Sequence, residues 1–321
     1  MSLPPGFRER MVLPAMAAPM FLVSGVDLAV ACCKAGIIGS LTRNHCRDDA
    51  EFEAQLVAVR ERLARARGEI PEPKIGPLAA NVSIGMDRAS RAAALDACRR
   101  HGVDLVVTAG GDPAPVAAMV HDWGGRLFHD VTTLRFAEKA IAAGVDGVVA
   151  IGAGGGGHSG IISHLALVPQ IRAMFSGTIV MAGAIATGAA IRAAEVLGAD
   201  LAYLGTRFIA TRESMADEAY KAMIVRASPA DLLYTAAVNG LPAMWMAESL
   251  RAHGLDPANL PTPQGHGSAH LPPGAKPWQT VWSAGQGVGL ISDVPAVSEL
   301  VARLVAEYRA AVAIPAFDQG A

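Results

Sequence analysis

A recurring turn signal constrains the fold of this chain more than any other feature of its sequence. Three times a helical stretch is followed by a glycine and then by a short apolar run, at Gly102-Val103-Asp104, Gly144-Val145-Asp146 and Gly198-Ala199-Asp200. Glycine ends helices because it enters the left-handed region without a Cβ penalty. We therefore expect a helix-to-strand turn at each place. Ala35-Gly36, Gly124-Gly125 and Ser176-Gly177 fit the same pattern.

Eight short apolar runs, each closed by polar residues or glycine, are predicted to be strands. They are Val12–Ala17, Ile37–Ser40, Ile75–Asn81, Leu105–Thr108, Arg126–His129, Gly147–Ile151, Thr178–Ala182 and Leu201–Leu204. Between them lie stretches with apolar residues at helical spacing, such as Asp49–Arg67, Arg88–Arg100, Thr133–Ala142 and Gly188–Leu197. Apolar strands that alternate with helices indicate a covered parallel sheet, and eight such units predict an α/β fold closed as a (β/α)₈ TIM barrel. An open doubly wound sheet is the alternative.

The regular alternation ends after the eighth predicted strand. Helices are expected near Met215–Ala227, Leu241–His253 and Val294–Ala313, and a Pro-, Gly- and His-rich stretch runs from Pro257 to Lys276. A long irregular stretch in a compact enzyme is typically a lid or substrate loop, with disorder as the alternative. We predict a barrel core over residues 1–227, an inserted substrate or lid region over 228–293 near the active-site mouth, and a C-terminal helix over 294–321 that packs back on the barrel.

Composition restricts the possible partners. The formal net charge is −2 and basic residues are mixed with acidic ones, so no nucleic-acid surface is indicated. Cys32, Cys33, Cys46 and Cys98 show no Cys-x-x-Cys spacing, which predicts reduced core residues rather than disulfides or a metal site. The first ten residues lack the apolar core of a signal peptide, and no apolar run is long enough for a membrane span. We therefore expect a cytoplasmic enzyme of small molecules. The oligomeric state stays open.

Two glycine-containing turns follow the seventh and eighth predicted strands, where barrels of this class commonly bind phosphate. They are Ala182-Gly183-Ala184-Ile185-Ala186-Thr187-Gly188 and Gly205-Thr206-Arg207-Phe208. Backbone N–H groups at glycines can donate to an anion, and the dipole of a following helix favours its negative charge. Their paired position predicts a phosphate site.

The run Gly152-Ala153-Gly154-Gly155-Gly156-Gly157-His158-Ser159-Gly160 is the most unusual feature of the chain. Successive glycines cost backbone entropy on folding, so close approach to a ligand is the economical explanation. The imidazole of His158 at the end of this run is a candidate base for taking a proton from a substrate carbon. His45, His129, His164, His266 and His270 have no comparable setting. The run is not a dinucleotide fingerprint, because its glycines are contiguous.

A set of motifs, in order along nearly the whole chain, resembles the nitronate monooxygenase family, formerly called 2-nitropropane dioxygenases. The motifs are Ala17-Ala18-Pro19-Met20, Asn81, Thr108-Ala109-Gly110-Gly111-Asp112-Pro113, Gly156-Gly157-His158, Ala182-Gly183-Ala184, Gly205-Thr206-Arg207-Phe208 with Ala210-Thr211-Arg212-Glu213, and Trp282-Ser283-Ala284-Gly285-Gln286-Gly287.

The resemblance implies an FMN-binding barrel in which His158 is the catalytic base toward nitroalkanes. It implies that an alkyl nitronate is oxidised by O₂ to a carbonyl compound and nitrite, without a nicotinamide. Gly183, Gly205 and Thr206 would hold the FMN phosphate. The remaining residues expected around the cofactor are Ala17, Ala18, Pro19, Met20, Asn81, Asp130, Gly156, Gly157, Ala182, Ala184 and Gln286.

The sequence departs from the family pattern at two places. Some relatives carry a lysine after strand 5, where this chain reads Phe128-His129-Asp130 and places a negative charge. The frequent Ser-Gly-Gly after strand 7 is Ala182-Gly183-Ala184 here, which removes a hydroxyl donor.

Two other functions stay open at this point. One is an FMN-dependent NAD(P)H reductase of quinones or enoyl thioesters, built on the same fold. The other is a barrel without redox chemistry that binds a phosphate ligand at the strand 7 and strand 8 turns.

Overall fold

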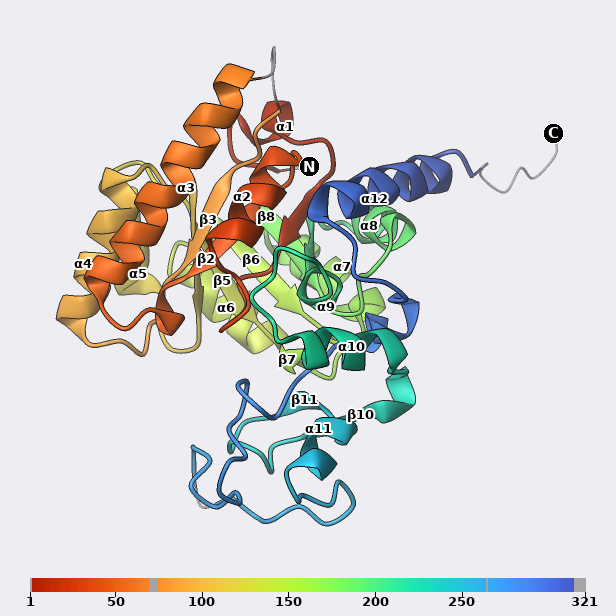
Figure 1. The fold of residues 1–321 in the computed structure, drawn as a ribbon. Helices are drawn as coiled ribbons and strands as arrows, with labels where there is room; N and C mark the ends of the chain where they lie inside the picture. The colour runs from red at the N-terminus through yellow and green to blue at the C-terminus, as the bar shows by residue number, and fades with distance from the viewer. Residues whose placement is uncertain (1, 70–73, 264, 315–321) are drawn as a thin grey trace.

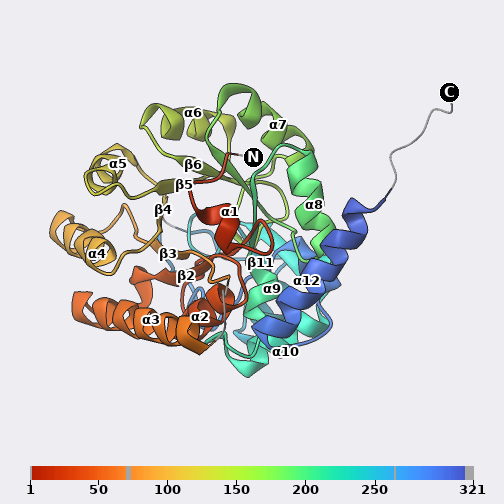
Figure 2. The ribbon, with the colours of Figure 1, turned by 90° about the horizontal axis from the view of Figure 1, so that it is seen from above.

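The structure, a computed structural model, describes residues 2–69, 74–263 and 265–314. Eight parallel strands form one sheet in the order β1-β9-β8-β6-β5-β4-β3-β2. A parallel bridge between Met16 and Ile38 joins the two ends of this sheet, so the strands enclose a barrel that Figure 2 shows end-on. The strands are β1 Ala15–Ala17, β2 Gly39–Thr42, β3 Leu78–Asn81, β4 Leu105–Ala109, β5 Leu127–Val131, β6 Gly147–Ile151, β8 Thr178–Ala182 and β9 Leu201–Leu204. The predicted barrel is confirmed.

Helices surround the barrel and alternate with its strands (Figure 2). They are α2 Val26–Lys34, α3 Asp49–Glu69, α4 Arg88–Arg100, α5 Ala114–His121, α6 Leu134–Ala142, α7 His164–Met174 and α8 Gly188–Val196. The 3-10 turn η1 Arg43–His45 follows β2, and the helix of one turn α9 Thr206–Ile209 follows β9. Side chains alternate along each strand, so Leu105 and Val107 lie in the barrel interior while Val106 packs in the layer under the helices.

The three repeated glycines have the backbone conformation that the sequence predicts. Gly102, Gly144 and Gly198 have φ angles of 58°, 83° and 103°, in the left-handed region. Gly36 and Gly124 share it, with φ of 78° and 75°. The interpretation of Ser176-Gly177 as such a turn is wrong, because α7 ends at Met174 and Phe175 after it is extended. Arg172 stabilises this connection in place of a left-handed glycine, because its guanidinium donates to the carbonyls of Phe175 and Gly177.

The aspartate after each repeated glycine binds the start of the neighbouring strand. Asp104 accepts the Leu78 N–H at 2.8 Å, Asp146 the Leu127 N–H at 2.9 Å, and Asp200 the Ile179 N–H at 2.8 Å. These three carboxylates also form ion pairs, with Arg10, Arg126 and Arg172 respectively. A fixed acceptor at the first residues of a strand sets its register against the next strand.

The barrel interior is filled at one end and open at the other. The short helix α1 Phe7–Arg10 lies across one end of the ring (Figure 2), and Phe7 is buried with Met16 and Phe128 in the interior cluster. At the carboxyl ends of the strands the interior side chains are small, as at Ala18 and Ala182. Large side chains fill one end of the barrel, and small ones leave space at the end where the strands have their carboxyl termini.

The region after the barrel lies over that mouth (Figure 1), and part of it packs with barrel residues in one hydrophobic cluster. It contains α10 Glu218–Arg226, η2 Pro229–Asp231, β10 Leu232–Thr235, β11 Ala243–Met246, α11 Ala247–Ala252 and η3 Gln286–Leu290. The strands β10, β11 and β7 Gly157–His158 form a second, antiparallel sheet. The predicted helix Leu241–His253 is wrong over its first part, because Ala243–Met246 pairs on both edges as β11.

The last helix, α12 Val297–Val312, packs against α8 and α2, and residues 315–321 lie outside the described part. The four cysteines are buried and free, which confirms their prediction as core residues. No helix within the described residues is long and apolar enough to cross a membrane. The region 257–276 has turns and irregular backbone over its described residues, all but 264.

We predict that Asp200→Ala lowers the free energy of unfolding by about 3 kcal/mol, since it removes the carboxylate that pairs with Arg172 and accepts a buried backbone N–H. Chemical denaturation followed by circular dichroism measures the loss. Asp146→Ala breaks the equivalent contact at a more exposed carboxylate (side-chain exposure 18% against 3%) and is expected to cost about 1 kcal/mol. Equal losses in the two variants would contradict burial as the cause.

Candidate functional site

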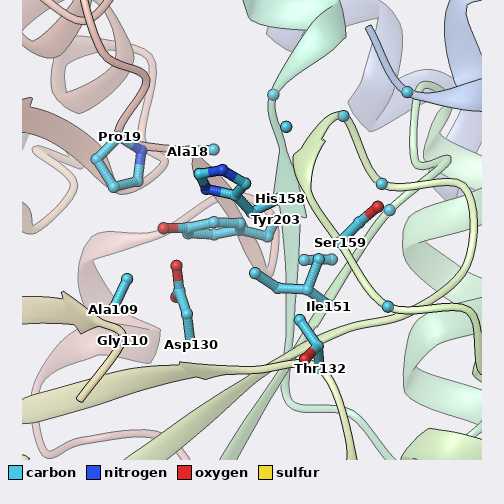
Figure 3. A pocket seen from close by; sticks show the side chains of 18 of the residues that line it. Ala18, Pro19, Ala109, Gly110, Asp130, Thr132, Ile151, His158, Ser159 and Tyr203 are labelled. Carbon is cyan, nitrogen blue, oxygen red and sulfur yellow. The ribbon is translucent and has the colours of Figure 1, made fainter. Parts of the chain in front are cut away.

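A cavity of about 1810 Å³ opens at the carboxyl ends of the barrel strands. Twelve of the predicted site residues line it, from four strand ends and the glycine run (Figure 3). They are Ala18, Pro19, Met20, Asp130, Gly156, Gly157, His158, Ala182, Gly183, Ala184, Gly205 and Thr206. Ligand pockets for drug-sized molecules usually span about 300–1,000 Å³. The cavity therefore has room for a cofactor together with a second molecule.

Three predicted cofactor residues do not line this cavity. Ala17 is buried in the layer beneath the helices, and Asn81 donates its side-chain amide to the Val107 carbonyl at 3.3 Å. Gln286 lies against the glycine run, where its backbone N–H donates to the Gly154 carbonyl at 2.8 Å. Their contact with a flavin stays a prediction. Gln286 has a structural contact that supports the loop carrying His158.

The imidazole of His158 faces the cavity and is held on two sides. Asn239 donates its side-chain N–H to Nε2 of His158 at 3.0 Å, and the Asn239 oxygen accepts the Leu241 N–H at 3.2 Å, which fixes the orientation of the amide. Trp278 contacts the imidazole edge-on, with ring centroids 5.3 Å apart. Loss of water around the ring lowers the pKa of His158 below its ordinary value, against the opposing effect of Asn239. The imidazole is therefore neutral at neutral pH.

The inserted region positions the loop that carries this histidine. Strand β7 pairs with β11, with His158 opposite Ala243 and Gly157 opposite Met244. Ser283 accepts the Gly157 N–H at 2.7 Å and donates to the Met244 carbonyl at 2.5 Å. These bonds fix the position of His158 from outside the barrel.

The glycine turns give the cavity a rim of bare backbone. A Cβ at Gly157 or Gly205 would meet no atom closer than 3.9 Å or 3.6 Å, so these two positions are open toward the cavity. Ala184 has a φ of 57°, which is strained for a residue with a side chain and keeps the turn after β8 in an unusual shape. The helix that follows does not offer its first amide to a ligand, because Gly188 N–H donates to Glu307 at 2.7 Å. A contribution of the helix dipole to anion binding stays a prediction.

Three side chains that line the cavity have a buried polar atom without a hydrogen-bond partner among the described residues. They are Asp130 at the end of β5, Tyr203 near the end of β9 and Ser159 beside His158, all labelled in Figure 3. Oδ1 of Asp130 and the hydroxyl of Tyr203 are buried polar atoms with no partner among the described residues. Burial raises the pKa of Asp130 to about 7, and burial followed by the charge of Asp130 raises that of Tyr203 well above its ordinary value.

These residues fit a bound flavin mononucleotide. The glycine rim admits a planar group and presents backbone to an anion, the small interior side chains leave space, and the unpartnered polar atoms suit its ring carbonyls and nitrogens. No group of three or more His, Cys, Asp or Glu side chains in the described part of the chain has the arrangement of a metal site.

Sequence reasoning missed Asn239, Trp278 and Tyr203. Asn239 and Trp278 lie in the inserted region, 81 and 120 positions from the histidine that they contact. Tyr203 lies within a correctly predicted strand, but only the barrel geometry turns its side chain into the cavity. The alternation of side chains along β9 was the one signal that pointed to it.

A protein-family model described as nitronate monooxygenase matches residues 9–307. A curated relative, a nitronate monooxygenase of Paraburkholderia phytofirmans, is 35% identical over 218 residues, which cover 62% of this chain and 59% of the relative. The matched segment thus spans about three fifths of that protein.

Two solved structures have the same fold. A nitroalkane oxidase from Streptomyces ansochromogenes aligns with a TM-score of 0.72 and 24% identity, over 94% of this chain and 96% of its own. The enoyl reductase domain of MlnA from Bacillus amyloliquefaciens aligns with a TM-score of 0.69 and 13% identity, over 96% and 97%. The family match over nearly the whole chain, on a barrel of this architecture, shows that the protein belongs to the nitronate monooxygenase family of oxidoreductases.

Proposed function

We propose that this protein is an FMN-dependent monooxygenase that oxidises alkyl nitronates, and nitroalkanes after their deprotonation, to a carbonyl compound and nitrite with O₂. The observation that carries the proposal is the position of His158. A neutral imidazole, held by Asn239 and Trp278, faces a cavity whose rim is built from glycine backbone. The family match and the curated nitronate monooxygenase relative support the reaction class.

His158 supplies the base that a nitroalkane requires. The carbon next to a nitro group must lose a proton before the molecule becomes an electron-rich nitronate. A neutral imidazole accepts that proton, and its lowered pKa keeps it neutral under physiological conditions. Asn239 orients the ring by donating to Nε2, and this bond has to break before Nε2 accepts the substrate proton. A preformed nitronate needs no base.

The barrel mouth holds the cofactor in this proposal. Backbone at Gly183, Gly205 and Thr206 binds the phosphate, and Ala18, Met20 and Gly157 surround the ring system. A flavin bound there would supply the electron-transfer chemistry between the anionic substrate and O₂. The inserted region covers the cavity through Trp278 and Leu241 and limits the access of water.

We expect His158→Ala to slow turnover of a neutral nitroalkane at least about 100-fold and turnover of the preformed nitronate less than about tenfold. FMN content of the purified variant should stay near that of the wild type. Nitrite release from both forms of the same compound measures the effect. His266→Ala, a histidine on the exposed surface of the inserted region, serves as the matched control and should leave both rates unchanged. Equal losses on the two substrate forms would remove His158 from the role of base.

A reductase of enoyl thioesters or quinones is the second candidate. The cavity of about 1810 Å³ exceeds the need of a flavin with a small nitroalkane, and it extends to Phe136, a side chain 50% exposed on α6. The shared fold with an enoyl reductase domain agrees with a larger substrate. Such an enzyme needs a nicotinamide to reduce its flavin.

Anaerobic mixing with excess NADH or NADPH separates the two candidates. For the monooxygenase we expect the visible flavin absorption band to persist for minutes after mixing, and to bleach when an alkyl nitronate is added. Bleaching by a nicotinamide within seconds would favour the reductase. A purified protein without colour that does not take up added FMN would reject both and favour a barrel that binds a phosphate ligand without redox chemistry.

A further inference from the structure

Asp130 and Tyr203 are two polar side chains that line the cavity from strands of the barrel and have no part in the proton transfer of the proposed reaction. Each has a buried polar atom without a hydrogen-bond partner among the described residues. An unsatisfied buried donor or acceptor costs about 1–3 kcal/mol. Two such atoms in one cavity indicate that a bound molecule completes their hydrogen bonds.

No charged side chain among the described residues forms an ion pair with the carboxyl group of Asp130. Its neighbours on β4 and β6 are Ala109 and Val149, which carry no titratable group. No ion pair within the described residues involves it. The titratable side chains that share the cavity with it are Asp112, His129, Lys139, His158, Tyr203, Tyr220 and Tyr234. Among these, Tyr203 is the one whose pKa the charge of Asp130 affects.

His129, next to Asp130 in the chain, does not compensate its charge. Its Nδ1 lies 2.8 Å from the hydroxyl of Thr108, and burial lowers its pKa to about 4. The imidazole is therefore neutral at pH 7. Loss of water raises the pKa of the Asp130 carboxyl to about 7, so its protonated form is populated near neutral pH.

We propose that Asp130, in its protonated form, and Tyr203 are a pair of hydrogen-bond donors for an electron-rich oxygen of the molecule bound in the barrel mouth. A neutral carboxylic acid beside a phenol is an effective donor set for an oxygen that carries or develops negative charge. The same acid in its ionised form repels such an oxygen. Binding is therefore strong below the pKa of Asp130 and weakens above it.

The inference rests on the proposed function only for the identity of the acceptor. A ring carbonyl of the flavin and an oxygen of the anionic substrate have the same chemistry, and experiment distinguishes them. The first probe is FMN added to protein freed of cofactor. The second is benzoate, an oxyanion that does not titrate near neutral pH, added to protein with and without FMN.

The experiment compares wild type, Asp130→Asn, Tyr203→Phe and the control Asp112→Asn by calorimetric titration between pH 6.5 and 8.5. For the wild type and the control we expect the affinity of one probe to fall about tenfold between pH 7 and 8.5, as the protonated fraction of Asp130 falls. Asp130→Asn keeps a donor at every pH, so its affinity should stay constant over this range.

Tyr203→Phe removes only the phenolic hydroxyl and should weaken the same probe about threefold to tenfold at pH 6.5. This variant tests the donor pair even if Asp130→Asn fails to fold, which circular dichroism reveals. Asp112 is exposed in the same cavity and binds the Ala114 N–H, a contact that asparagine preserves. The control therefore reports any pH effect of the phosphate or of other groups.

The two titrations decide which oxygen, if any, accepts hydrogen bonds from Asp130 and Tyr203. A pH dependence of FMN binding that Asp130→Asn abolishes identifies the flavin, and one seen only with benzoate identifies the substrate. Identical pH profiles in wild type and Asp130→Asn for both probes overturn the inference. Absence of any FMN binding in the wild type would instead reject the proposed function, while the benzoate titration of the cofactor-free protein still tests the donor pair.

Discussion

Register between the parallel strands is the constraint on which the rest of this structure depends. Asp104, Asp146 and Asp200 fix it from below, since each accepts an N–H of the neighbouring strand while the glycine two residues earlier ends the preceding helix. A slip of one residue would turn every side chain of a strand to the opposite face. Tyr203, three residues after Asp200, would then leave the cavity and pack under the helices. The chemistry at one end of the barrel is thus set by carboxylates at the other end.

The barrel was predictable because the sequence signals for its strands and helices lie within short segments of the chain. Each strand and most helices of the core are signalled within a few residues by glycine turns and apolar periodicity, and all eight predicted strands overlap observed ones. The second sheet was not predictable in this way. Residues 243–246 read as helix because the window is apolar and alanine and methionine favour helices. Their extended form comes from pairing with β10 and with β7, about 86 residues earlier in the chain, which no local window contains.

Some residues of the candidate site could also be predicted from the sequence, and others could not. His158 and the residues of the glycine turns stand out by residue type, and the structure brings them to one cavity. Family resemblance placed Asn81 and Gln286 near the cofactor, whereas their contacts here are with backbone of the barrel and of the glycine run. Asn239 and Trp278 carry no signal in the sequence, since an asparagine or a tryptophan in an irregular region has many possible settings. The structure singles them out because both contact the imidazole of His158.

The pairing of β7 with β11 has a consequence for how this kind of enzyme diversifies. The barrel supplies the rim, while the segment after the barrel holds the histidine through Ser283, Asn239 and Trp278. Under the proposed function, the barrel contributes the cofactor site and the later segment contributes the position of the base. Substitutions around β11 are then expected to change which molecules are deprotonated more than they change how the cofactor binds.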